Sequence, residues 1–389
     1  MVTAKLVRHF CSVCLLHGLL CAPLPGSDRW LPAPPQTMTP EEQSLLQDAA
    51  DGHLDVFPLL DAALLAENDT PDVEARDRFE KLARKLQALP DLPSAESHDF
   101  QRLEQRLATT LRLLHQQILV GQYRPDATSV TLALQKGHYN CVSSTILFVE
   151  LCRRQGIRTT PMASATHVFC RVEGPGRPID VQTTSPRWFD LSDEQRAAAT
   201  PDGAHSALPI TDAALVGKLY YNFGVQHLEH DRYQQAERAF RMSLLLDPQD
   251  ASARENLLAT WNNWALALAQ QGLYAEAMRR LDQARQVDPN YPPLRANLVH
   301  VTQQWAQSLC RLGRHPEALT LLESRKDSDP QAPLFIDGPP IVYRLWIEWL
   351  EQHGRPAEAE QVLNEALRRY PHSTLFRSDA LRISTPSSR

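Results

Sequence analysis

The spacing of apolar residues divides the chain into three blocks, of which the first is helical. Leucine and alanine recur every three or four residues in segments 53–66, 74–89 and 98–119, a period typical of amphipathic helices. Breaks rich in proline, aspartate and serine separate these segments. The run TPEEQ at 39–43 supplies a capping threonine, a first-turn proline and early carboxylates. The pattern predicts a helical N-terminal block over 41–120.

The second block, over 121–210, mixes two periods. Segment 141–155 is almost continuously apolar and ends in two arginines and a glycine, which predicts a buried helix. Segment 167–172 alternates as a half-buried strand does, and a Gly-Pro-Gly turn separates it from a second extended run at 177–184. The order helix, strand, turn, strand predicts an α+β unit.

The third block, over 211–375, is helical and repeats every 41 residues. A glycine column, Gly272, Gly313 and Gly354, has Asp231 in the place of the first glycine. Proline, alanine and aromatic columns keep the same register: Pro248, Pro289, Pro330 and Pro371; Ala236, Ala277, Ala318 and Ala359; Phe223, Trp264, Trp305 and Trp346. We predict four repeats, with the aromatic column packed in the core between them.

These columns resemble the tetratricopeptide repeat, in which a large residue precedes a small one in the first helix, alanine opens the second and proline ends it. The usual period is about 34 residues, so each unit here is longer. The resemblance implies an all-α solenoid that binds a protein or peptide partner. One polar column of the first helices is predicted to line its concave face, with a merely solvated helix face as the alternative: Tyr221, Asn262, Gln303 and Arg344.

Composition and charge exclude several classes of protein. The chain has 389 residues, is 43% hydrophobic and 22% charged, and carries a formal net charge of −6 without a block of like charges. We therefore expect several buried cores and no nucleic-acid partner. The chain has neither a glycine-rich phosphate loop nor a Cys/His set with zinc spacing, so no cofactor is expected. Its 7 cysteines are too few and too scattered for a disulfide scaffold.

The two ends of the chain differ in composition from the blocks between them. In 1–22, Lys5 and Arg8 precede a short apolar run, which is the order of a secretory leader. We predict a signal peptide and an exported protein; a cytoplasmic protein with an N-terminal extension is the alternative. The run is shorter than the roughly 20 apolar residues of a membrane span, so no stable span is expected. Residues 23–40 are predicted as a proline-rich linker and 376–389 as a disordered tail.

Three residues of the second block are candidates for chemistry. Cys141 opens the predicted helix, where the partial positive charge of a helix N-terminus lowers the pKa of a thiol. His167 opens the first strand and Asp180 lies on the second, so adjacent strands could join nucleophile, base and orienter. A register shift of one residue would turn Asp180 to the opposite face. The alternative is structural: a small buried cysteine, a core histidine and a turn aspartate.

The order of these residues resembles the transglutaminase-like superfamily of papain-like cysteine enzymes. The matching runs are Asn140-Cys141-Val-Ser-Ser, an apolar helix to Gly156-Ile157, His167-Val-Phe and Ile179-Asp180. The preceding helical block is similar to bacterial SirB-type proteins.

This resemblance implies an α+β papain-like core in which Cys141 is the nucleophile, His167 the general base and Asp180 the orienter. Gln135 would supply an oxyanion-hole donor. The activity implied is thiol-dependent acyl chemistry on an amide, with hydrolysis and transfer to an amine both open and with the repeats binding a protein substrate. The alternative is a non-catalytic repeat scaffold that carries an inactive core of this kind.

Overall fold

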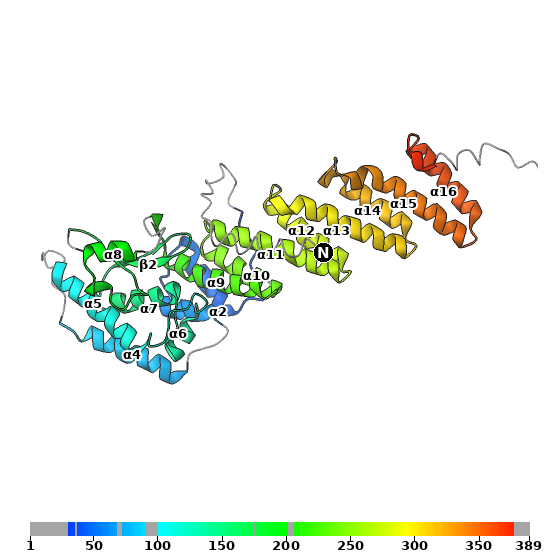
Figure 1. Cartoon of the computed structure of the whole chain (residues 1–389). Coiled ribbons are helices and arrows are strands. Elements are labelled where there is room, and N and C mark those ends of the chain that lie inside the picture. The colour runs from blue at the N-terminus through cyan, green and yellow to red at the C-terminus, as the bar shows by residue number, and fades with distance from the viewer. Residues whose placement is uncertain are drawn as a thin grey trace, which may run out of the picture. The chain divides into compact units, whose positions relative to one another are not determined.

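The computed structural model describes residues 30–35, 37–67, 72–90, 100–174, 176–200 and 206–376. The predicted leader at 1–22 and most of the predicted tail, 377–389, lie outside the described residues. The chain divides into two compact units, one up to Leu257 and the other from Leu258. Each unit has buried apolar clusters of its own, and Figure 1 labels the elements of both.

The N-terminal part of the first unit is helical. The threonine at the predicted start caps α2: the Thr39 hydroxyl accepts the backbone N–H of Glu42, whose carboxylate accepts the N–H of Thr39. The second helix begins at Leu59, later than the predicted residue 53, and Pro58 occupies its N-cap position. The helices are α2 (Pro40–Asp48), α3 (Leu59–Leu65), α4 (Val73–Gln87) and α5 (Phe100–Gln117).

The centre of the first unit is α7 (Cys141–Arg154), one residue shorter than predicted. Every side chain from Val142 to Cys152 is buried, so all sides of this helix are covered. Helices α3, α4 and α5 contact it, as do the sheet and a short helix that the sequence pattern did not predict, α6 (Val130–Lys136). A further unpredicted helix, α8 (Asp193–Ala199), has a capping box of its own.

A four-stranded antiparallel sheet packs against α7. The predicted strands correspond to β2 (Val168–Val172) and β3 (Ile179–Val181), and β1 (Thr159–Ala163) and β4 (Leu208–Pro209) join them in the order β3-β2-β1-β4. The valines and isoleucine of β2 and β3 belong to the core around α7, whereas Phe169 packs on the other face with Met162. This region is thus mostly helical with a small sheet; its papain-like assignment stays a prediction.

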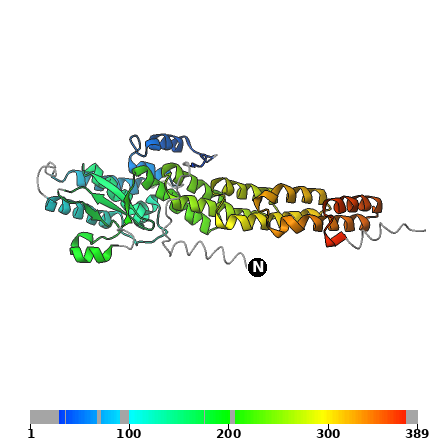
Figure 2. The same ribbon diagram turned by 90° about the horizontal axis from the view of Figure 1, so that it is seen from above.

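The third block forms helix pairs with the predicted period. The first helices are α9 (Asp212–Glu229), α11 (Ala251–Gln270), α13 (Pro292–Arg311) and α15 (Pro333–Gln352). The second helices are α10 (Tyr233–Leu246), α12 (Tyr274–Val287), α14 (His315–Arg325) and α16 (Pro356–Arg369). Figure 2 shows α12 to α16 of the second unit one after another, in colours that run from yellow-green to red.

The first helix pair belongs to the first unit. Leu215, Leu219 and Tyr220 of α9 are buried in the same core as α7, and Leu246 of α10 joins them. The sheet and the first repeat are separate in sequence at about residue 210, but their side chains form one core. The compact units divide later, inside α11.

The glycine column ends the first helix of each repeat. Gly272, Gly313 and Gly354 have φ of 79°, 73° and 69°, and Asp231 takes the same left-handed conformation with φ of 56°. The residue after each of them donates its N–H to a carbonyl five residues back, as Leu273 does to Leu268 at 3.0 Å. The 41-residue period therefore reflects a repeated helix C-cap.

The aromatic column is half-buried and lies between successive repeats of the second unit. Trp305 stacks on Tyr274 with ring centroids 6.4 Å apart, and Trp346 stacks on His315 at the same distance. The guanidinium carbon of Arg280 lies 3.7 Å from the ring centroid of Trp264. The aromatic column thus packs against the core clusters without being sealed inside them.

We predict that two glycine-to-alanine changes in the glycine column lower the free energy of unfolding by different amounts. Gly272→Ala adds a Cβ that meets no atom within 4 Å, so only the left-handed backbone is strained, at about 1–2 kcal/mol. Gly313→Ala should lose more unfolding free energy in urea, because its Cβ would lie 2.9 Å from Cζ2 of Trp349. Gly354→Ala, also without a near neighbour, is the control, and equal losses at all three positions would contradict the packing argument.

Candidate functional site

Cys141 is the first residue of α7 and is half-buried. Burial raises the pKa of its thiol, and the nearby backbone N–H groups of Val168, Cys141 and Val142 lower it. The sequence predicted a lowered pKa from the helix N-terminus alone, and that expectation is wrong, because the cost of desolvation exceeds the gain from the N–H groups. The contact with Val168 places the sulfur beside the residue that follows His167.

His167 is held at the end of the turn between β1 and β2. Its backbone N–H donates to the Ser164 hydroxyl at 3.2 Å, and its carbonyl accepts the N–H of Ser164 at 2.9 Å. Its Nε2 lies 2.6 Å from Oε1 of Gln182, which is 3% exposed. Because an amide oxygen only accepts, Nε2 carries the proton and Nδ1 is left as the basic nitrogen. Burial lowers the pKa of His167, and the bond to Gln182 partly offsets that change.

Asp180 does not take the expected place beside His167. It lies opposite Arg171 in the register of β2 and β3, and its two carboxylate oxygens accept from that guanidinium at 2.7 and 2.8 Å. The residue at the histidine is Gln182, two positions further along. Side chains two residues apart point to the same face of a strand. The sequence therefore predicted the correct face for the partner of His167 but placed that partner two residues too early. The same alternation of side chains makes Gln182 an equally good candidate from the sequence.

Polar side chains next to Gln182 fasten the end of β3 to α7. The Thr183 hydroxyl lies 2.9 Å from that of Ser144 and 2.8 Å from that of Thr145, and all three side chains are buried. The Thr183 carbonyl accepts from Nε2 of His115 at 2.9 Å. The position of Gln182 relative to α7 therefore depends on bonds from two helices.

Gln135 lies on the last turn of α6 and is half-buried. Gly137, with φ of 73°, ends that helix, and the chain then runs through Tyr139 into α7. The role of Gln135 as an oxyanion-hole donor stays a prediction.

Several side chains of the predicted concave column bond to other residues of the protein. In the second unit, Asn262 is 2% exposed, and its Oδ1 accepts from Asn297 of the next first helix at 2.7 Å. In the first unit, the hydroxyl of Tyr221 accepts from Asn256 at 3.1 Å, one repeat earlier in the same register. Asn262 is thus turned toward a neighbouring helix and not toward a ligand. Gln303 is exposed, and Arg344 pairs with Glu348 at 2.6 Å.

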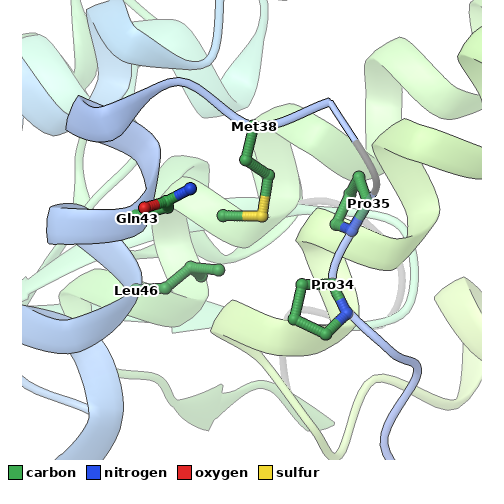
Figure 3. Close-up of a pocket in the computed structure, with 5 residues that line it drawn as sticks. All are labelled: Pro34, Pro35, Met38, Gln43 and Leu46. Atoms are coloured by element: carbon green, nitrogen blue, oxygen red, sulfur yellow. The ribbon is translucent and has the colours of Figure 1, made fainter.

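A small apolar pocket lies beside α2 in the first unit. Its lining residues are Pro34, Pro35, Met38, Gln43 and Leu46, and Figure 3 shows the Met38 side chain pointing toward Leu46 beside the two prolines. Helix α2 is tied to α10, because the Arg238 guanidinium lies 2.5 Å from the Glu42 carboxylate. Cys141 is not among the residues that line this pocket.

The described residues hold neither a metal-binding cluster nor a membrane-spanning helix. Within those residues, no three or more His, Cys, Asp or Glu side chains gather as a metal ion would require. No helix among them combines the length and the apolar character needed to cross a bilayer.

Comparisons with known proteins support the repeats. Two tetratricopeptide repeat family profiles match residues 268–335 and 340–383. No curated protein matches the chain. Among solved structures, a match is the crystal structure of menin that reveals the binding site for Mixed Lineage Leukemia protein. The identity is 12%, the match covers 90% of this chain and 94% of that one, and the TM-score of 0.31 does not establish a shared fold.

The chain therefore carries tetratricopeptide repeats at its C-terminus, and repeats of this kind indicate protein partners. The transglutaminase-like interpretation of 121–210 stays a prediction.

We predict that the stability of the first unit falls in mild acid because His115 is buried. Burial lowers the pKa of this histidine below its unfolded value of 6.5, and its bond to the Thr183 carbonyl only partly offsets that. The unfolded chain then binds more protons, so this contribution to stability is complete above pH 6.5 and is lost as the pH falls below it. Urea midpoints measured against pH should fall less steeply for His115→Gln. His53→Gln, which changes an exposed histidine, is the control. If the urea midpoint of His115→Gln falls with pH as steeply as that of the wild type, the assignment to His115 is wrong.

Proposed function

We propose that this protein is a thiol-dependent acyl-transfer enzyme whose protein substrate is bound by its tetratricopeptide repeats. The observation that carries the proposal is the hydrogen bond between Nε2 of His167 and Oε1 of Gln182, next to the backbone N–H of Val168 that contacts the Cys141 sulfur. Nucleophile, base and orienting amide then follow the order of a Cys-His-amide triad, in which Gln182 replaces the predicted Asp180.

The raised pKa of Cys141 determines which form of the mechanism is proposed. The resting site holds a neutral thiol and a neutral imidazole, so the base removes the proton during attack. The sulfur forms a bond to an amide carbonyl carbon while its proton moves to Nδ1 of His167. The carbonyl π electrons move to the oxygen. When the tetrahedral adduct collapses, the C–N bond breaks and the amine leaves with that proton. Water or a second amine then attacks the thioester carbon and gives a proton to Nδ1 of His167. The C–S bond breaks, and the sulfur takes that proton to restore the thiol.

Gln182 has the role of an orienting residue in this proposal. Its amide oxygen fixes the imidazole tautomer with the proton on Nε2, and it stabilises the imidazolium once Nδ1 is protonated. Its burial at 3% exposure and the hydroxyl contacts of the neighbouring Thr183 hold it in place.

A non-catalytic scaffold is the second candidate, and two observations favour it. Burial raises the pKa of the Cys141 thiol, and Asp180, the residue expected to orient the histidine, is paired with Arg171. In that case the repeats alone carry the function, as an adaptor that binds proteins. For either candidate, we propose that the protein is exported, because its N-terminus resembles a secretory leader.

Alkylation of individual cysteines by iodoacetamide, followed by peptide mass spectrometry on the full chain, distinguishes the two candidates. We expect His167→Ala to slow alkylation of Cys141 by roughly tenfold or more at neutral pH, because the base is lost. Gln182→Leu should also slow it, and Gln182→Glu, which keeps an acceptor oxygen, should slow it less.

Cys310 is the matched control within the same molecule. It is also a free, half-buried thiol whose pKa is raised by burial, and it lies on α13 of the second unit. Its rate should not change in any of these variants. If His167→Ala leaves the Cys141 rate equal to the wild type, the enzyme proposal is wrong and the scaffold is favoured.

A further inference from the structure

A chain of side-chain hydrogen bonds connects the first repeat to the N-terminus of the cysteine helix. Asn222 of α9 donates from its Nδ2 to the hydroxyl oxygen of Thr128 at 2.9 Å. The same oxygen accepts from Nδ2 of Asn140 at 2.5 Å. Asn140 is the N-cap residue of α7, directly before Cys141. Three side chains thus join a repeat helix to the residue that precedes the proposed nucleophile.

The direction of the hydrogen bond between Asn140 and Thr128 is fixed. Oδ1 of Asn140 accepts the backbone N–H groups of Val142 and Ser143 at 2.9 and 3.1 Å, so its Nδ2 must face Thr128. The Thr128 hydroxyl therefore accepts from Asn140 with one lone pair, and its second lone pair is left for Asn222. Thr128 is 0% exposed, so water cannot replace a lost donor without entering the core.

The bonds end at the groups that act on the sulfur. The backbone N–H groups of Cys141 and Val142 lower the pKa of the thiol against the effect of burial, and the N–H of Val142 is itself accepted by Oδ1 of Asn140. Their direction depends on the first turn of α7, which the N-cap Asn140 holds. A shift of Asn140 would change both the position of the sulfur and the help it receives from these N–H groups.

We propose that Asn222 is a positioning residue for Cys141, so that the first tetratricopeptide repeat is a working part of the thiol site as well as a binding module. This inference rests on the proposed function and adds that the reactivity of Cys141 depends on α9 through Thr128 and Asn140. A thiol-reactive substrate analogue would then meet a competent cysteine only while α9 holds the N-cap in place.

A matched set of variants in the full chain tests the chain of bonds. Asn222→Leu removes the donor at similar size, and Thr128→Val removes the shared hydroxyl with little change in shape. Thr128→Ser keeps the hydroxyl and is the rescue variant. Gln226→Leu is the control, because Gln226 lies one turn further along α9 and donates at 2.7 Å to the Asp126 carbonyl of the same loop, outside the chain of bonds.

The measurement is the rate of Cys141 alkylation by iodoacetamide as a function of pH, with the urea midpoint of each variant recorded alongside. Asn222→Leu and Thr128→Val should raise the apparent pKa of Cys141 and slow its alkylation at neutral pH by roughly 3- to 10-fold, the range of a weakened N-cap. Thr128→Ser and Gln226→Leu should match the wild type, and Cys310 should not change in any variant. A change in midpoint without a shift in the pH profile would mean a structural role only and would overturn the proposal.

His167→Ala in the same experiment separates the two proposals. If it slows Cys141 while Asn222→Leu does not, the thiol enzyme is supported and the positioning role is wrong. If Asn222→Leu shifts the profile while His167→Ala has no effect, Asn222 positions Cys141, but the base proposed for it is wrong.

Discussion

The first unit depends on how the N-terminus of a fully buried helix is satisfied. Helix α7 lies at the centre of the core, so the free N–H groups of its first turn cannot be solvated by bulk water. Asn140 accepts two of them, and its Nδ2 finds acceptors inside the protein in the Thr128 hydroxyl and the Pro125 carbonyl. This requirement fixes the loop before α6 and brings α9 against it. The proposed thiol site lies at the same helix end.

The repeats solve a different problem, because no helix pair can bury its apolar face alone. In the second unit, the last two pairs pack their aromatic residues against the pair before them: Trp305 stacks on Tyr274, and Trp346 stacks on His315. The first pair uses the core around α7 instead, through Leu215, Leu219 and Tyr220. One repeat is thus shared between the folding of the core and the start of the repeat array.

The candidate site shows why the spacing of residues in the sequence predicts which face of a strand a side chain occupies but not which residue it contacts. A two-residue step keeps a side chain on the same face and moves it by about 6–7 Å along the strand. Asp180 and Gln182 are therefore equivalent in pattern, and the pairing of Asp180 with Arg171 leaves Gln182 for His167. In the same way, the pattern placed Asn262 on an open face, although Asn297 of the next repeat covers it. Both outcomes depend on which element lies alongside.

Local interactions explain what the sequence determined by itself: the helix cap at Thr39, the glycine turns at Gly272, Gly313 and Gly354, and the period of the repeats. Each of these needs only residues within a few positions of one another, so composition and spacing are sufficient. The tertiary structure decided the partner of His167, the extra strands β1 and β4, the burial that raises the pKa of Cys141, and the joining of α9 to the core. These features depend on contacts between residues far apart in sequence, where the register of strands and the desolvation of a side chain are set by the whole packed core.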